Sequence, residues 1–366
     1  MSATAPVPLD RLGRPPRILV VKTSALGDVV HALPTFEALA TALPEAVLGW
    51  VVEEPFAPLL AGLPRLETIV AVRLRRWRKN LLDREVRREL VRFVQDVRRF
   101  RPDVALDLMG NHKAGVLARL SGARWRVGPR RQDRREPSSS VWINHPVQTV
   151  RGHAVDEMGS LLAGLGVVAP RLVYRPEHVG PADVPAPDLP APYLLVQPGA
   201  GWGSKQYPPE RWGRVVAELG RRHPELAIGV LAGPGEGELA RRVAAAAGEQ
   251  ARVVVPRGME GLIGVLRPAR LVLGGDTGPV HLAHALGRPV LALHGPTDPE
   301  RHGPWRAAEQ TLWKKLPCSF CYRRFEATKA CLLEIAPTAV ADRAAELLSL
   351  RAPSVGSAID PPPTPG

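Results

Sequence analysis

Short apolar runs alternate along the first half of the chain with longer segments in which apolar residues recur every three or four positions. The apolar runs are residues 17–22, 47–52, 68–72 and 104–108, and the longer amphipathic segments are residues 29–43 and 84–100. Short buried strands that alternate with amphipathic helices predict a parallel sheet covered by helices. Residues 124–128 form one more candidate strand, which an arginine-rich loop follows.

The same alternation restarts after a proline-rich stretch. The second set of candidate strands is residues 193–197, 227–232, 253–255, 271–274 and 290–293, and the candidate helices between them are residues 209–222, 236–247, 259–266 and 279–286. Proline stiffens the chain and removes backbone donors, so we interpret residues 176–192 as an interdomain linker.

The length of the chain favours two domains, because 366 residues exceed what one hydrophobic core usually supports. We expect an α/β protein with two Rossmann-like, doubly wound domains that face each other across a cleft. The predicted divisions are a flexible lead-in at residues 1–16, an N-terminal acceptor-binding domain at 17–175, the linker at 176–192, a C-terminal nucleotide-binding domain at 193–350 and a disordered tail at 351–366.

Composition narrows the class of protein. Hydrophobic residues make up 45% and charged residues 23% of the chain, which excludes wholesale disorder. No apolar run approaches the roughly 18 to 20 residues of a transmembrane helix, and the N-terminus lacks the apolar core of a secretory signal. Only three cysteines occur, which fits a reducing cytoplasm.

The net charge of +13 favours an anionic partner, either nucleic acid, an acidic membrane surface or an acidic substrate. Basic residues crowd three segments of the first half, residues 73–79, 84–101 and 124–135. Each of these clusters has a simpler interpretation as a solvated surface. Aromatic residues make up only 5% of the chain, which argues against a surface that stacks nucleic-acid bases.

The turn after the first predicted strand places hydroxyls, a glycine and a carboxylate at the start of a helix. Its sequence, KTSALGDVVH at residues 22–31, has the spacing of neither the dinucleotide fingerprint nor the P-loop. Asp28 either caps the helix or acts as a general base on a bound hydroxyl.

Three turns of the second half suit a nucleotide. Residues 274–281 (GGDTGPVH) open a helix after a strand, where small residues and free N–H groups accommodate a diphosphate. Glu236 either begins a helix or accepts hydrogen bonds from ribose hydroxyls. Lys205 either neutralises a leaving diphosphate or is a solvated loop lysine.

Together these segments resemble a known family. Residues 22–31, the following Leu33-Pro34, residues 274–281 and residues 294–299 (HGPTDP) are similar to the signature segments of the ADP-heptose:lipopolysaccharide heptosyltransferases, glycosyltransferase family 9 of the GT-B fold. The similarity runs from about Arg17 to about Pro337. Residues 50–54 (WVVEE) and 75–79 (RRWRK) resemble heptosyltransferase I, which adds the first heptose.

The resemblance implies an inverting, metal-independent transfer of heptose from ADP-L-glycero-D-manno-heptose to the Kdo-bearing inner core of lipopolysaccharide. It implies that Asp28 is the catalytic base and that Lys205 stabilises the departing ADP. No cofactor is implied, because ADP-heptose is a co-substrate. The implied donor-binding residues are Thr23, Ser24, Glu236, Asp276, Thr277, Gly278 and His281.

The implied partners are acidic Kdo-bearing lipid A and the anionic surface of the inner membrane, not nucleic acid. We therefore expect a cytoplasmic enzyme that is peripheral on the cytoplasmic face of that membrane. The expected acceptor-binding residues, interleaved with Trp77, are Arg75, Arg76, Arg78 and Lys79.

Cys318, Cys321 and Cys331 resemble a C-terminal cysteine cluster found elsewhere in the family. Three thiolates can contribute to a zinc site, but a tetrahedral site needs a fourth ligand, and Phe325 stands where another family cysteine is expected. Other interpretations remain at this point: heptosyltransferase II or another family-9 transferase, a GT-B-like sugar-nucleotide epimerase, and a nucleic-acid-binding protein.

Overall fold

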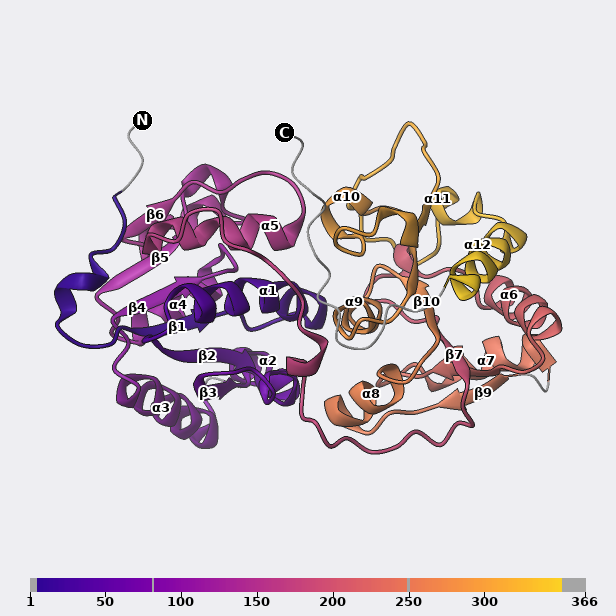
Figure 1. Ribbon diagram of the computed structural model, residues 1–366, viewed down its shortest axis with the longest axis horizontal. Helices are drawn as coiled ribbons and strands as arrows, with labels where there is room; N and C mark the ends of the chain where they lie inside the picture. The colour runs from indigo at the N-terminus through magenta and orange to yellow at the C-terminus, as the bar shows by residue number, and fades with distance from the viewer. Residues whose placement is uncertain (1–4, 81, 249–250, 351–366) are drawn as a thin grey trace. The chain divides into compact units, whose positions relative to one another are not determined.

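The computed structural model describes residues 5–80, 82–248 and 251–350. The chain divides into two compact units, and each is described by itself (Figure 1). Unit 1 comprises the residues up to Tyr174 together with His178–Gly180, and unit 2 comprises Arg175–Glu177 and the residues from Pro181 onward. Among the described residues, no helix combines the length and the apolar character that crossing a bilayer requires.

Unit 1 contains a parallel six-stranded sheet in the order β3-β2-β1-β4-β5-β6. The strands are β1 (Arg17–Val21), β2 (Val47–Glu53), β3 (Leu66–Val72), β4 (Val104–Asp107), β5 (Trp125–Pro129) and β6 (His145–Val147). The helices are α1 (Leu26–Ala42), α2 (Leu74–Lys79), α3 (Arg84–Arg99), α4 (His112–Leu120) and α5 (Ala154–Gly159).

Unit 2 repeats the plan with a parallel six-stranded sheet in the order β12-β11-β10-β7-β8-β9. The strands are β7 (Tyr193–Gln197), β8 (Ala227–Leu231), β9 (Ala251–Val254), β10 (Leu271–Gly275), β11 (Val290–His294) and β12 (Thr311–Trp313). The helices are α6 (Pro209–Arg222), α7 (Gly237–Ala247), α8 (Gly258–Leu266), α9 (Gly278–Ala285), α10 (Pro299–His302), α11 (Ala330–Leu333) and α12 (Pro337–Ser349).

The central strands are apolar because helices cover both faces of each sheet. In β1, β4, β7 and β10 nearly every residue is buried. Such continuous apolar runs are typical of parallel strands, whereas strands with one solvated face alternate. The prediction of two doubly wound α/β sheets is therefore confirmed.

The strand order of each unit creates one topological switch point. The first strand of unit 1, β1, lies between β2 and β4, and the first strand of unit 2, β7, lies between β8 and β10. Open α/β sheets bind ligands outside the carboxyl ends of the strands at such a point. The topology therefore predicts ligand-binding sites at the turns after β1 and β4 in unit 1 and after β7 and β10 in unit 2.

The N-terminal segment differs from the expected flexible lead-in. Val7 is buried, and its N–H donates to the Gly164 carbonyl at 2.9 Å. Arg14 donates to both carboxylate oxygens of Asp103, at 2.9 and 2.7 Å. Residues 7–14 are therefore fixed within unit 1 by one apolar side chain and one bidentate ion pair, neither of which produces periodicity in the sequence. The predicted disordered tail at residues 351–366 lies outside the described residues.

Candidate active site

The turn after β1 brings a buried lysine against the predicted base. Lys22 is only 5% exposed, and its Nζ lies 3.3 Å from Asp28 Oδ1 and donates to the Leu108 carbonyl at 3.1 Å. Leu108 directly follows β4, so Lys22 spans the switch point of unit 1. The other carboxylate oxygen, Asp28 Oδ2, accepts the Ala25 N–H at 3.1 Å and so caps α1. Asp28 can therefore cap α1 and also act as a general base, because capping uses only one of its two carboxylate oxygens.

The surroundings of Asp28 favour its charged form. Burial opposes that form, but the Lys22 ammonium, the Ala25 N–H and the charge of Arg135 outweigh it and hold the pKa of Asp28 below its ordinary value. The side chain remains 47% exposed. Asp28 is therefore ionised at neutral pH and accessible, which a general base requires.

The two hydroxyl residues beside Asp28 differ in accessibility. Thr23 is fully buried, and its hydroxyl donates to Met109 Sδ at 3.3 Å. Thr23 therefore ties the turn after β1 to the turn after β4 and does not present its hydroxyl to solvent. Ser24, the next residue, is half-buried. Of the two, only Ser24 remains suited to direct contact with a ligand.

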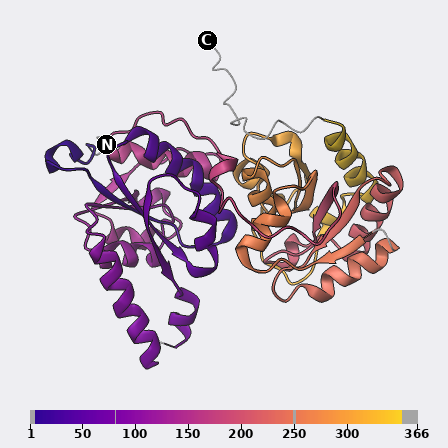
Figure 2. The ribbon, with the colours of Figure 1, turned by 60° about the horizontal axis from the view of Figure 1, so that its bottom comes forward.

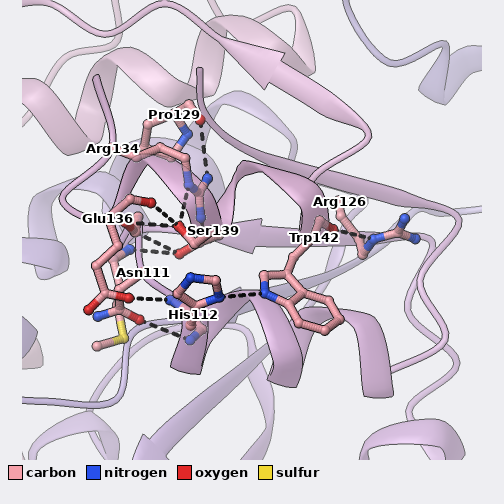
Figure 3. A network of polar contacts seen from close by, with 12 residues as sticks. Asn111, His112, Arg126, Pro129, Arg134, Glu136, Ser139 and Trp142 are labelled. Carbon is pink, nitrogen blue, oxygen red and sulfur yellow. Dashed lines mark hydrogen bonds and ion pairs between the residues drawn. The ribbon is translucent and has the colours of Figure 1, made fainter. Parts of the chain in front are cut away.

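A network behind the turn after β4 fixes the loop that carries Arg135 (Figure 3). Arg134 and Asp107 form a fully buried ion pair of 2.6 Å. The guanidinium also donates to the Ser139 hydroxyl at 2.8 Å and to the Pro129 carbonyl at 3.1 Å. Removing one partner of a buried pair leaves an uncompensated charge and typically costs about 3–5 kcal/mol. This pair therefore anchors the loop after β5, and with it Arg135, near the predicted base.

The outer part of the same network fixes the tautomer of one histidine (Figure 3). The Trp142 indole N–H donates to His112 Nδ1 at 3.0 Å, and His112 Nε2 lies 2.9 Å from the Ser138 hydroxyl. Since an indole only donates, Nδ1 is the acceptor in this hydrogen bond. His112 therefore positions the loop through both of its ring nitrogens.

Helix α2 presents the predicted acceptor-binding cations unequally. Arg76 is paired with Glu85 and Glu89 of α3. Arg75, Arg78 and Lys79 are exposed and have no carboxylate within ion-pairing distance in the part of the chain that the structure describes. Trp77, which is interleaved with these cations in the sequence, does not lie at the surface with them. Its ring is buried against Phe93, and its indole N–H donates to Glu89 at 2.8 Å.

At the switch point of unit 2, three ionisable side chains, Lys205, Asp276 and His281, are linked by an ion pair and a hydrogen bond. Lys205 Nζ lies 2.6 Å from Asp276 Oδ2 and donates to the Asp276 carbonyl at 3.1 Å. His281 Nε2 lies 2.9 Å from Asp276 Oδ1 and, since a carboxylate only accepts, it donates. Burial disfavours charge on Asp276, but His281 and the Lys205 ammonium outweigh it and hold its pKa well below the ordinary value.

Two polar groups beside Lys205, Asp276 and His281 lack a hydrogen-bond partner among the described residues. Thr277, the N-cap residue of α9, has a buried hydroxyl without a hydrogen bond. His294, at the end of β11, has a buried Nε2 without one, while its Nδ1 lies 3.4 Å from the Thr297 hydroxyl. Burial lowers the pKa of His294 to about 4, so the imidazole is neutral at pH 7. The start of α9 thus combines a helix N-terminus with an unsatisfied hydroxyl, as an anion site does.

Glu236 is held tightly at the end of β8. Its Oε2 accepts the Gly233 N–H at 3.0 Å and the Gln197 amide at 3.1 Å. A Cβ on Gly199 would collide with the Glu236 carboxylate, so a larger residue there would displace that carboxylate. Glu236 therefore does more than begin α7, and its carboxylate is aimed at the loop after β7.

The cysteine-bearing loop packs over that same loop. Arg324 and Lys205 both lie over the Trp202 ring, at 4.5 and 4.6 Å from its centroid. Cys318 and Cys321 are exposed and Cys331 is buried, and all three are free thiols. Within the described ranges no three His, Cys, Asp or Glu side chains are arranged to hold a metal ion, so the candidate zinc cluster is not supported.

The structure therefore gathers the predicted residues into two groups. Thr23, Ser24 and Asp28 lie at the carboxyl edge of the unit 1 sheet, and α2 follows β3 at the same edge. The group in unit 2 is Lys205, Glu236, Asp276, Thr277, Gly278 and His281, all in turns after strands or at the helix starts that follow them.

Sequence reasoning missed several residues that support these groups. The most important are Lys22, Asp107, Arg134, Gln197 and His294. A polar residue at the end of a buried apolar strand is the signal that marks four of them, namely Lys22, Asp107, Gln197 and His294.

Comparison with known proteins gives one consistent family. Residues 90–331 match the family model described as Glycosyltransferase family 9 (heptosyltransferase). Lipopolysaccharide heptosyltransferase 1 of Pseudomonas aeruginosa is 35% identical to this chain over 313 residues, which cover 84% of this chain and 86% of the relative.

Solved structures agree with the sequence comparison. E. coli heptosyltransferase WaaC with ADP superimposes with a TM-score of 0.75 and 28% identity, covering 90% of this chain and 99% of that chain. The same enzyme with ADP-2-deoxy-2-fluoro heptose gives a TM-score of 0.72 over the same shares, also at 28% identity.

Proposed function

This chain belongs to glycosyltransferase family 9, the heptosyltransferases, and from this premise we propose that it moves heptose from ADP-L-glycero-D-manno-heptose to the Kdo-bearing inner core of lipopolysaccharide. It is thus a glycosyltransferase that acts in lipopolysaccharide core biosynthesis. The single observation that carries the proposed chemistry is the Lys22–Asp28 pair at the switch point of unit 1, because it provides an accessible carboxylate that stays ionised.

We propose that unit 2 binds the donor. Glu236, fixed by Gly233 and Gln197, accepts hydrogen bonds from the adenosine ribose. Thr277 and the first N–H groups of α9 bind the diphosphate, and His281 contacts the sugar side of the same group. Two solved structures of one relative support binding of this donor, since they contain ADP or an ADP-heptose analogue and resemble this chain over 90% of its length.

The proposed reaction is a single displacement that inverts the anomeric carbon. An acceptor hydroxyl oxygen forms the new bond to that carbon, while the bond from the carbon to the β-phosphate oxygen of ADP-heptose breaks. Asp28 takes the hydroxyl proton, and the electron pair of the broken bond leaves with ADP. A positioned general base contributes about 10² to 10⁴ in rate.

The departing ADP requires positive charge, and Lys205 is the residue proposed to supply it. Two contacts of its ammonium go to the carboxylate and the carbonyl of Asp276, which leaves a donor for a phosphate oxygen. The Lys205 ammonium offsets the charge of Asp276, and His281 donates a hydrogen bond to its carboxylate, so Asp276 holds the lysine without strongly repelling the diphosphate. Because lysine and the α9 N–H groups provide this stabilisation, we expect the transfer to be metal-independent.

The proposed acceptor is the acidic Kdo-bearing lipid A at the anionic inner-membrane surface. Arg75, Arg78 and Lys79 lie beyond the end of β3, at the same sheet edge as Asp28, and carry charge that no carboxylate within ion-pairing distance in the described chain neutralises. Arg76 is proposed with them, although Glu85 and Glu89 engage it here. On this proposal the enzyme is peripheral on the cytoplasmic face of the membrane.

The test is ADP release from ADP-heptose with and without Kdo–lipid A, combined with NMR of the product's anomeric configuration. We expect acceptor-dependent release, an inverted glycosidic bond and unchanged rates in EDTA. If turnover requires an acceptor that already carries one heptose, the activity is that of heptosyltransferase II and not that of heptosyltransferase I. A retained configuration would overturn the single-displacement mechanism.

A further inference from the structure

Helix α3 has one face in the core of unit 1 and an opposite face that is strongly basic. The core face consists of Val86, Phe93 and Val97, which are buried against the sheet. At 100° per residue, the strip of α3 opposite these residues contains Arg84, Arg88, Val91, Arg92, Gln95 and Arg99. All six residues are exposed, and none of them is acidic. Figures 1 and 2 show α3 at the outside of unit 1.

The acidic residues of α3 do not neutralise this strip. Glu85, Glu89 and Asp96 lie along one flank of the helix, and the first two are engaged with Arg76 and, for Glu89, Arg73. Arg84, Arg88 and Arg92 have no carboxylate within ion-pairing distance among the residues that the structure covers. Asp96 lies 3.9 Å from Arg99, which is 84% exposed. The charge of the strip is therefore available to a partner.

The basic surface continues past the C-terminal end of α3 into a depression at the amino edge of the sheet. The depression has a volume of about 920 Å³, and its lining is Arg14, Pro15, Arg17, Val47, Arg98, Arg99 and Arg101. Asp103 and Glu67 engage Arg14 and Arg17. Arg101 is exposed, and its guanidinium has no hydrogen-bond or ion-pair partner in the described ranges. The arginines of this lining can attract an anionic group such as a phosphate.

We infer that the exposed strip of α3, with the depression at its C-terminal end, is the surface by which the enzyme docks on an anionic lipid bilayer. Charge complementarity identifies the partner, since cations near an anionic leaflet are attracted to it and the depression accepts a phosphate-bearing headgroup. Val91 is 55% exposed and Leu82, just before α3, is 85% exposed, so two apolar side chains are available to enter the interface. The strip contains no aromatic residue on which a nucleic-acid base would stack.

The position of α2 connects this surface to the site. Helix α2 contacts the N-terminal half of α3 through the Arg76–Glu85 ion pair and the Trp77–Glu89 hydrogen bond. Docking through α3 therefore brings Arg75, Arg78 and Lys79 close to the lipid surface. The inference rests on the proposed function only where it identifies the lipid acceptor. Docking on an anionic bilayer requires only the basic surface, which takes no part in catalysis.

The test measures vesicle flotation with phosphatidylcholine alone and with phosphatidylcholine mixed with phosphatidylglycerol. The docking variant is Arg88→Gln/Arg92→Gln/Arg99→Gln. Its matched control is Arg214→Gln/Arg257→Gln/Arg270→Gln, which removes the same charge from exposed positions of unit 2. We expect wild type to bind only the anionic vesicles, with binding weakened by salt. The docking variant should lose about 100-fold in partition coefficient, and the control should stay within about threefold of wild type.

Two further readouts separate this inference from the proposed function. Heptosyl transfer to a deacylated, water-soluble acceptor should be unchanged in the docking variant, because α3 contributes nothing to the chemistry. If wild type transfers no heptose but binds vesicles as described, the proposed function fails while docking through α3 stands. Equal loss in the docking and control variants, or binding of duplex RNA in preference to anionic vesicles, would overturn the inference.

Discussion

At the scale of single residues, a lysine spans the switch point in both units. Lys22 follows β1 and bonds to the residue after β4, and Lys205 follows β7 and bonds to the residue after β10. Each lysine is also paired with an aspartate, Asp28 in unit 1 and Asp276 in unit 2. The two pairs differ in accessibility, since Asp28 is 47% and Asp276 only 8% exposed. The exposed carboxylate is suited to accept a proton, and the buried one is suited to position its lysine.

Lys22→Met should shift the pH dependence of transfer. Lys22 helps to hold the pKa of Asp28 below its ordinary value, so removing the ammonium raises that pKa. A base with a higher pKa is protonated sooner as the pH falls. The acid limb of the kcat/KM profile should therefore move to higher pH.

The control for this prediction is Lys113→Met, which removes an exposed ammonium from the same half of the molecule. Its acid limb should stay where it is in wild type. If Lys22→Met lowers the rate equally at every pH, Lys22 acts through local structure and not through the charge on Asp28.

Part of the site was predictable residue by residue, because strand ends are visible in the sequence. Asp28, Lys205, Glu236 and Asp276 were all found in turns that follow apolar runs. Which polar group pairs with which depends on strand order, and no local pattern encodes that order. The buried Asp107–Arg134 pair, for example, joins residues 27 positions apart through the pairing of β4 with β5.

At the scale of elements, the loop after β7 and the start of α7 are in direct contact at the proposed donor site. Gly199 contacts the Glu236 carboxylate so closely that any Cβ would collide with it. A Cβ on Gly201, two residues further on, would have no atom of the described residues within 4 Å. The two glycines therefore offer a matched pair of substitutions in a single loop.

Gly199→Ala should raise the KM for ADP-heptose about tenfold with a smaller effect on kcat, because it displaces the carboxylate proposed to bind the ribose. Gly201→Ala should match wild type. Steady-state kinetics at saturating acceptor measures both variants. Equal donor KM values for the two variants would contradict the proposal that Glu236 binds the donor.

Helix α2 gives a second prediction at this scale. Arg75→Ser/Arg78→Ser/Lys79→Ser removes the cations that no carboxylate of the described chain engages, while Arg76 and Trp77 keep the helix attached to α3. The acceptor KM should rise about tenfold or more, and the donor KM should stay unchanged. A comparable rise in both KM values would show that α2 does not act on the acceptor.

At the scale of the whole molecule, the alternation of strands and helices was sufficient to predict both sheets. The predicted strand at 193–197 and helix at 209–222 agree with β7 and α6 at both ends. The edge strands β6 and β12 were missed because each has only three residues. The basic segment at residues 84–101 consists of α3 and the two residues that follow it. Only the helix shows which of its arginines lie together on one face.

The most direct test of Asp28 as the general base is acceptor-dependent ADP release by Asp28→Asn compared with wild type. Asparagine can still accept the Ala25 N–H that caps α1, but it cannot take a proton. We predict a fall in kcat of about 10² to 10⁴ with normal folding. Asp83→Asn, at the N-cap residue of α3, whose side chain accepts the Glu85 N–H, should leave the rate unchanged. Transfer by Asp28→Asn within about threefold of wild type would contradict the assignment of Asp28 as the general base.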